Sequence, residues 1–312
     1  MSQRDRLLAL TVAVMWGANF LAVHATIQHF PPLFAATLRF AVLAVPTMLL
    51  VPWPGVKVRW LIGYGLGFGT GHFAFLFVAM HIGMPTGLAS LVLQASAPFT
   101  VLLGAVLLRE RITPMVASGI GLAVVGMSII GWQRAEHAAL LPMILTLLAA
   151  LSWAAGNLCN RNGFAETTSQ VNPLHFTLWM SVVPPLPMFA LSLAFEGPSA
   201  GWQALAGVGT SEGMVALGGL VYIVLIGTVA GSGLWSTLMS RNPAGVVAPF
   251  SLLVPVVGMT LAFLVLDERP TAIEIAAAGI VIIGVLIGSM SRPRPVPVPP
   301  TPPQAECATV GR

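Results

Sequence analysis

The chain has 312 residues, of which 56% are hydrophobic and only 8% are charged, and its formal net charge at pH 7 is +4. Because soluble domains carry about 25% charged residues, this composition excludes an ordinary soluble protein. The basic residues lie between apolar runs and form no patch, which argues against a nucleic-acid-binding protein.

The first apolar run extends from about Leu7 to Ile27, which is too long for the core of a cleavable signal peptide. We expect it to be the first of ten membrane-spanning helices, each of which needs about 20 mainly apolar residues. The predicted spans cover residues 7–27, 32–52, 60–80, 88–108, 114–132, 139–160, 173–195, 215–238, 246–266 and 271–290. The predicted fold class is an all-α membrane protein with ten transmembrane helices.

The segments between the predicted spans indicate the orientation of the chain. Most of the 14 basic residues lie in segments on the same side as the N-terminus, so the positive-inside rule predicts that both termini are cytoplasmic. Residues 196–214 are predicted to form a longer external loop. The proline-rich segment 291–312 is predicted to be a disordered cytoplasmic tail.

The chain contains an internal repeat with an offset of 158 residues. It is carried by the pairs Gly69 and Gly227, Pro85 and Pro243, Gly87 and Gly245, Glu110 and Glu268, and Gly126 and Gly284. We expect one five-helix repeat in residues 1–136 and a second in residues 137–290. Because five is an odd number, the two repeats should be inverted relative to each other in the membrane. Inverted repeats are common in secondary transporters, whose substrate site lies between the halves near the midplane.

Several short motifs occur in both halves. The first half contains Trp16-Gly17-Ala18-Asn19-Phe20, Leu38-Arg39-Phe40 and Leu108-Arg109-Glu110-Arg111, and the second contains Trp153 with Asn157 and Leu266-Asp267-Glu268-Arg269. In these motifs the chain resembles the EamA-type branch of the drug/metabolite transporter superfamily, over about residues 7–290. The resemblance implies a carrier of the bacterial inner membrane that exports small metabolites. Within the branch, the chain resembles exporters of aromatic and other apolar amino acids.

Polar and aromatic residues within the spans are predicted to line a mostly apolar pocket, because polar groups in the bilayer usually face a protein interior or a wet cavity. The predicted substrate-binding residues are Trp16, Asn19, His72, Phe75, Gln94, Trp153, Asn157, Trp179, Tyr222, Trp235 and Ser251. Asn19, Gln94 and Asn157 would meet the charged groups of an amino acid. The alternative for the two asparagines is a hydrogen bond that holds neighbouring helices together.

A second group is predicted to have gating or structural roles: Arg39, Gly69, Pro98, Gly227 and Pro255. Arg39 lies about 10 Å along its span, where it could support the fold or pair with a substrate carboxylate. Each proline frees the carbonyl group four residues earlier, which in transporters often marks the substrate site. The alternative for the prolines is simple bending, and for the glycines it is close helix packing.

Other features limit the function. None of the ten acidic residues lies in the middle of a predicted span, so a strongly coupled pump is not indicated, although His72 could carry protons instead of acting as a hydrogen-bonding strut. The two cysteines lack metal-ligand spacing, and no catalytic motif is present, so we expect that the protein binds no metal or cofactor and is not an enzyme.

The expected partners are a small substrate and the bilayer, and the protein is expected to be a monomer or weak homodimer. The alternatives are an exchanger of other small polar solutes, a membrane enzyme or a scaffold.

Overall fold

The structure is a computed structural model that describes residues 1–109, 112–136, 140–167, 171–242 and 244–289. In these ranges the chain is helical and contains no strand. The first half consists of α1 (Gln3–Ile27), α2 (Pro32–Leu50), α3 (Val58–Tyr64), η1 (Gly65–His72), α4 (Phe73–His81), α5 (Thr86–Val92), η2 (Leu93–Ala95), α6 (Ser96–Leu108) and α7 (Pro114–Glu136). The second half consists of α8 (Leu140–Ala165), α9 (Pro173–Met180), α10 (Pro185–Phe195), α11 (Ala200–Ala206), α12 (Ser211–Val221), η3 (Tyr222–Ala230), α13 (Gly231–Arg241), α14 (Ala244–Val247), η4 (Ala248–Leu252), α15 (Leu253–Leu266) and α16 (Ala272–Ser289).

Eight helical segments of the described chain are long and apolar enough to cross a membrane: Gln3–Ile27, Pro32–Leu50, Val58–His81, Thr86–Leu108, Leu140–Ala165, Pro173–Phe195, Ser211–Met239 and Pro249–Leu266. Two shorter apolar helices, Pro114–Ile130 and Ala272–Gly288, lie at the fifth and tenth predicted spans. The prediction of an all-helical membrane protein is therefore confirmed. The longer connection predicted at 196–214 contains the short helix α11.

The irregular parts of the helices recur in the two halves. Both η1 and η3 are π-helical, and both η2 and η4 are 3₁₀-helical. In the π segments, Thr70 and Thr228 are 158 residues apart, and each donates its hydroxyl to the carbonyl five residues earlier, at Gly65 and Ile223. Such segments are uncommon and frequently lie at functional sites. The repeat is thus visible in the backbone as well as in the sequence.

The helix ends show the same recurrence. Arg109 and Asp267, again 158 residues apart, are the two non-glycine residues of the described chain with positive φ, at 55° and 53°. Each ends a long helix in the left-handed conformation, α6 and α15 respectively.

Equivalent helices of the two halves cross in the same way. Helix α1 runs antiparallel to the segment α12–η3–α13, since Gly219 lies against Thr26, Gly227 against Asn19 and Gly231 against Trp16. Helix α8 runs antiparallel to α3–η1 in the same manner, with Gly63 against Cys159 and Gly67 against Gly156. Small residues at these positions let the backbones approach closely.

The two ends of the helix bundle can be identified from polar contacts. At one end, Asn242 donates to Asp5 over 3.3 Å. At the other end, the backbone N–H of Thr86 donates to Glu268 over 2.8 Å. Helix α1 begins at the first end. Helix α7 finishes near the second end, because Gln133 in its last turns accepts a hydrogen bond from Thr271, and α8 begins just after it. The equivalent helices α1 and α8 therefore run in opposite directions.

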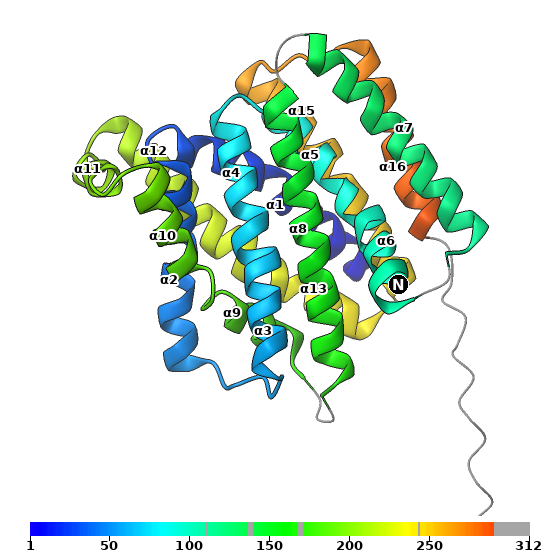
Figure 1. Ribbon diagram of the computed structural model, residues 1–312, viewed down its shortest axis with the longest axis horizontal. Coiled ribbons are helices and arrows are strands. Elements are labelled where there is room, and N and C mark those ends of the chain that lie inside the picture. Colours follow the sequence, from blue (N-terminus) through cyan, green and yellow to red (C-terminus); the bar gives the residue numbers. More distant parts are fainter. Residues whose placement is uncertain (110–111, 137–139, 168–170, 243, 290–312) are drawn as a thin grey trace, which may run out of the picture.

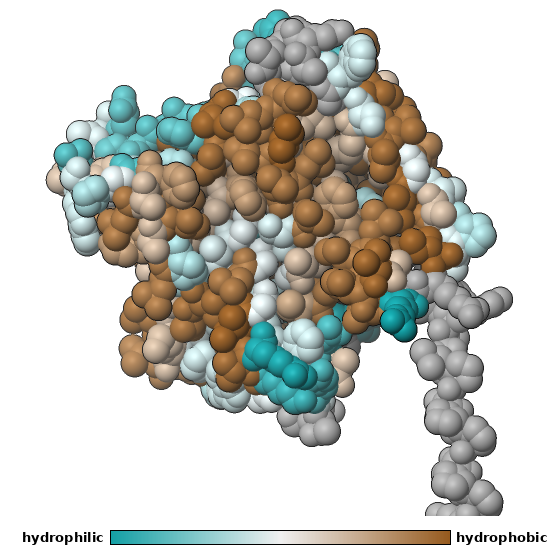
Figure 2. All heavy atoms as spheres, viewed as in Figure 1, coloured by the Kyte–Doolittle hydropathy of each residue, from teal (hydrophilic) through white to brown (hydrophobic). Residues whose placement is uncertain are grey.

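Helices α7 and α16 pack side by side at the edge of the bundle (Figure 1), and residues of both, such as Met127 and Ala277, belong to the main buried core. Hydrophobic side chains cover much of the middle of the visible face, while hydrophilic residues gather at its lower edge and upper left (Figure 2). Exposed apolar residues such as Leu50, Leu186 and Val106 are suited to lipid. An apolar belt between polar ends is what a bilayer requires of a spanning protein.

Candidate functional site

Four of the predicted site residues meet where α1 crosses the η3 segment. The indole N–H of Trp16 donates to the carbonyl of Gly227 over 2.9 Å, and its ring packs against Trp235 with centroids 5.2 Å apart. The hydroxyl of Tyr222 donates to the carbonyl of Met15 over 3.1 Å. These contacts join the first span to the π-helical part of the second half.

Asn19 lies at the same crossing, one turn from Trp16. Its Oδ1 atom is buried and has no hydrogen-bond partner. A Cβ atom on Gly227 would lie 2.3 Å from this oxygen, so the absence of a side chain at 227 is what lets the amide sit there. Gly227 is therefore needed for the position of Asn19, in addition to allowing the helices to approach.

Arg39 reaches the next residue of the same segment. Its side chain is only 6% exposed, and its Nη2 donates to Oγ1 of Thr228 over 3.1 Å. The guanidinium carbon lies 3.8 Å from the centre of the Phe73 ring, a cation–π contact. The Nε and Nη1 atoms are buried without a hydrogen-bond partner.

His72 belongs to an aromatic cluster between η1 and α8. Its ring stacks on Phe68 with centroids 5.4 Å apart and lies 4.9 Å from the ring centroid of Trp153. Its Nδ1 is 3.3 Å from the carbonyl oxygen of Ala149. This contact with the backbone of α8 is the one expected if His72 acts as a hydrogen-bonding strut between two helices.

Gln94 and Ser251 join the 3₁₀ segments of the two halves. The amide Nε2 of Gln94 lies 3.5 Å from the carbonyl oxygen of Ser251. Pro255 has no N–H to donate to this carbonyl, and the amide of Gln94 approaches the oxygen from the other half of the chain. Pro98 stands in the corresponding helix of the first half, four residues after Gln94.

The two asparagines that we predicted to be equivalent have different surroundings. Asn19 faces Gly227 of η3, whereas Nδ2 of Asn157 donates to Oγ1 of Thr100 on α6 over 3.2 Å. One residue more separates Asn157 from Trp153 than separates Asn19 from Trp16, and one residue turns a helical side chain by about 100°. The two amides therefore point at different neighbouring helices.

The remaining predicted site residues lie elsewhere. Trp179 donates its indole N–H to the carbonyls of Val51 and Pro52 and packs against Trp53, at the end of α2. Phe75 is half-buried on α4. A Cβ on Gly69 would lie 2.3 Å from Pro184, which makes this glycine a packing position between η1 and the break before α10.

Two hollows in the described part of the chain lie away from Trp16, Asn19 and Arg39. One of about 340 Å³ is lined by apolar side chains of α6, α7 and α8, among them Pro98, Met127 and Leu147. The other, of about 230 Å³, lies beside Glu268 and Glu274.

Acidic residues of the second half cap helices of the first. Glu268 accepts hydrogen bonds from the backbone N–H groups of Thr86 and Gly87, at 2.8 and 2.9 Å, at the start of α5. Glu196 accepts from those of Leu33 and Phe34, at 2.6 and 3.0 Å, at the start of α2. A carboxylate at a helix N-terminus satisfies free donors and favours the helix dipole. These caps tie the halves together at one end of the bundle.

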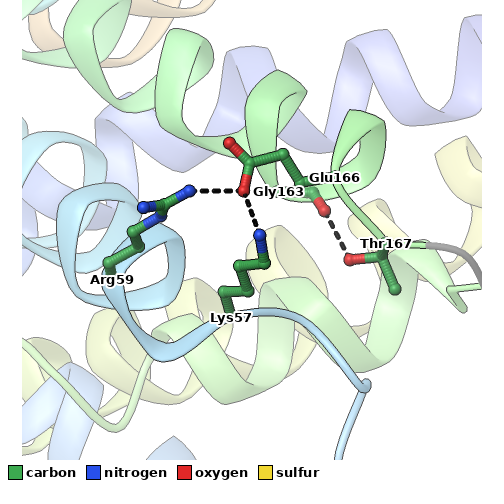
Figure 3. A network of polar contacts seen from close by, with 5 residues as sticks. All are labelled: Lys57, Arg59, Gly163, Glu166 and Thr167. Atoms are coloured by element: carbon green, nitrogen blue, oxygen red, sulfur yellow. Dashed lines mark hydrogen bonds and ion pairs between the residues drawn. The ribbon is translucent and has the colours of Figure 1, made fainter.

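An ion-pair network ties the halves together at the other end (Figure 3). Glu166, just after α8, lies 2.7 Å from Nζ of Lys57 and 2.5 Å from Nη2 of Arg59. Lys57 and then Arg59 lower the pKa of the Glu166 carboxyl to about 2. Neither this network nor Thr228 was predicted from the sequence; the signals were an acid in a segment predicted to be cytoplasmic, where basic residues dominate, and a threonine next to the repeated Gly227.

The network should respond to acid only well below neutral pH. Because the pKa of Glu166 is lowered from its ordinary 4.5 to about 2, its stabilising effect should be complete above pH 4.5 and be lost as the pH falls towards 2. We therefore expect the difference in melting temperature between the native protein and Glu166→Gln to be constant from pH 5 to 8 and to shrink below pH 4. Thermal unfolding of both proteins across this range measures it. A difference that already changes between pH 6 and 8 would contradict the assignment.

Comparisons with known proteins agree with this architecture. The EamA-like transporter family matches the chain twice, over residues 6–132 and 140–290. Proteins of Escherichia coli (strain K12) and Salmonella typhimurium (strain LT2), each named "Probable amino-acid metabolite efflux pump", are 39% identical to it over 92% of this chain and 95% of their own. An "Uncharacterized transporter" of Archaeoglobus fulgidus is 25% identical over 90% of this chain and 96% of its own. A solved crystal structure, 20% identical, matches the fold with a TM-score of 0.56 over 92% of this chain and 96% of the other.

Proposed function

The chain belongs to the EamA-like transporter family, and from this premise we propose that it exports small amino acids, chiefly aromatic and other apolar ones, across the bacterial inner membrane. The observation that carries the proposal is the 39% identity, over nearly the whole chain, to proteins named as amino-acid metabolite efflux pumps. The repeated motifs and the family match both indicate a transporter and not an enzyme.

The proposed mechanism is alternating access between two inverted repeats, residues 1–136 and 137–290. The first four spans of one repeat would rock against the corresponding four of the other, with α7 and α16 as a supporting pair. The contacts that join the halves support this division, because they lie at opposite ends: Glu166 with Lys57 and Arg59 at one, Glu268 with Thr86 at the other. A cycle that opens one end at a time would break one set while the other holds.

The sidedness follows from charge. With the positive-inside rule, the end that contains Lys57, Arg59 and both termini is cytoplasmic. Opening of the Glu166 network would then admit substrate from the cytoplasm, and opening of the caps at Glu268 and Glu196 would release it outside. Transport by a monomer is sufficient for this scheme, and a weak homodimer is compatible with it.

A transport assay tests the proposal. Purified protein in liposomes loaded with unlabelled phenylalanine, leucine or another apolar amino acid should accelerate the entry of the same labelled amino acid by counterflow. Protein-free liposomes are the control. If no amino acid shows counterflow with folded protein, the proposal is wrong. Counterflow of sugars or nucleobases alone would favour the exchanger of other small solutes.

A further inference from the structure

Buried side-chain nitrogen or oxygen atoms without a hydrogen-bond partner belong to only three residues of the described chain: Asn19, Arg39 and Trp60. Most buried polar groups in proteins are paired, so each exception calls for an explanation. Trp60 lies near the cytoplasmic end, beside Arg59. Asn19 and Arg39 both lie in the interior of the bundle.

Asn19 and Arg39 converge on two consecutive residues of one π-helical segment. Asn19 comes from α1, and its Oδ1 faces Gly227. Arg39 comes from α2, and its Nη2 is bonded to Thr228. The unpaired groups are complementary in kind, since the amide oxygen accepts hydrogen bonds and the guanidinium nitrogens donate them.

The carboxylates whose contacts the structure describes are bonded elsewhere. They all lie at helix ends: Asp5 with Asn242, Glu166 with Lys57, Glu196 with Leu33, Asp267 with Arg269, Glu268 with Thr86, and Glu274 with Thr271. Glu212 is exposed in the first turn of α12. A buried cation without a counter-ion is costly, and inside a membrane protein such a residue commonly marks a substrate path.

The surroundings of Arg39 also suit an anion. One face of the guanidinium lies over the ring of Phe73 at 3.8 Å. The planar ring holds the group in place without using any of its N–H donors. Nε and Nη1 thus keep their donors for a ligand.

Resting on the proposed function, we infer that Arg39 binds the α-carboxylate of the exported amino acid and that Oδ1 of Asn19 binds its α-ammonium group. The Gly227–Thr228 step of η3 holds the two groups in place. Recognition then depends on the part that all amino acids share. The apolar side chain of the substrate would lie on the neighbouring aromatic rings of Trp16 and Trp235, which discriminate weakly by size.

Competition binding with analogues that lack one charged group tests each half of the inference. Labelled phenylalanine is bound to the purified full-length protein and displaced by phenylalanine amide, which has no carboxylate, or by 3-phenylpropionate, which has no ammonium. Hydrogen bonds to charged groups contribute enough that each analogue should bind about tenfold or more weakly than phenylalanine.

The variants should remove one preference each. Arg39→Gln should bring the affinity ratio of phenylalanine to its amide close to one and leave the preference over 3-phenylpropionate. Asn19→Ala should bring the affinity ratio of phenylalanine to 3-phenylpropionate close to one and leave the preference over the amide. Arg39→Lys should keep part of the preference for a carboxylate. Arg6→Gln, which removes an exposed arginine on α1, is the matched control and should behave as the native protein.

The outcomes separate this inference from the proposed function. If phenylalanine and both analogues bind the native protein equally well, the inference is wrong while the export proposal stands; this comparison needs no variant to fold. If the ratios are unchanged in folded Arg39→Gln, Arg39 is not the carboxylate-binding residue. If no amino acid binds the native protein at all, both proposals fail.

Discussion

Replacing Gly156 by alanine is expected to force α8 away from η1 and to destabilise the protein by about 1–3 kcal/mol, the usual cost of overpacking a core. A Cβ at 156 would lie 2.6 Å from the backbone nitrogen of Phe68 and 2.8 Å from its Cβ. Gly67 of η1 lies in the same contact with α8, since a Cβ added to it would lie 2.7 Å from the nitrogen of Gly156. Because backbone faces backbone, no side-chain rotation can relieve the clash.

The separation would also weaken contacts made by the part of α8 that precedes Gly156. His72 would lose its approach to the carbonyl of Ala149, and Phe68 its contact with Trp153. Thermal unfolding of the purified protein in detergent measures the loss. Gly218→Ala is the matched control, because a Cβ there meets nothing within 4 Å, and alanine is otherwise the better helix former. Equal melting temperatures for the two variants would contradict the close contact of α8 with η1.

The second large effect is expected at the pair formed by α7 and α16. A Cβ on Gly119 would lie 2.6 Å from the carbonyl oxygen of Gly284, and one on Gly284 would lie 2.7 Å from the nitrogen of Ala123. Gly119→Ala and Gly284→Ala should each lower the melting temperature, again by overpacking worth about 1–3 kcal/mol. The double variant should cost less than the sum, because one displacement of the helices relieves both clashes.

Neighbouring glycines of the same two helices provide the controls. Gly121 on α7 and Gly279 on α16 have nothing within 4 Å of an added Cβ. Gly121→Ala and Gly279→Ala should leave the melting temperature unchanged or raise it. Additive losses in the double variant, or equal losses at Gly121 and Gly119, would show that the two helices do not pack along this line.

Much of the fold could be predicted because it depends on local properties of the chain. The length of an apolar run is set by the thickness of the bilayer, so the span that ends near Ile27 and the one that ends near Leu266 can be found without any knowledge of their neighbours. The offset between Gly69 and Gly227 likewise predicts two copies of one unit, and the irregular segments η1 and η3 recur with it. Polar residues within the spans, such as Asn19 and Arg39, stand out because they are few.

The partners of these residues could not be predicted. A spanning helix is apolar on nearly all sides, so no polar face marks which side turns towards the protein. Trp179 was placed in the predicted pocket by its position in a span, yet it packs at the end of α2 with Trp53. Asn157 was paired with Asn19 by sequence, yet a shift of one residue turns it towards Thr100.

The sequence by itself determined the membrane class, the inverted duplication and the family of this protein, because bilayer thickness and repeated motifs are written along the chain. Only the tertiary structure decided that Arg39 meets Thr228, that Asn19 faces Gly227, and that Glu166 binds Lys57. Those contacts depend on how each helix is rotated and where it crosses its neighbour. Both are set by the packing of small residues across helices that are distant in sequence.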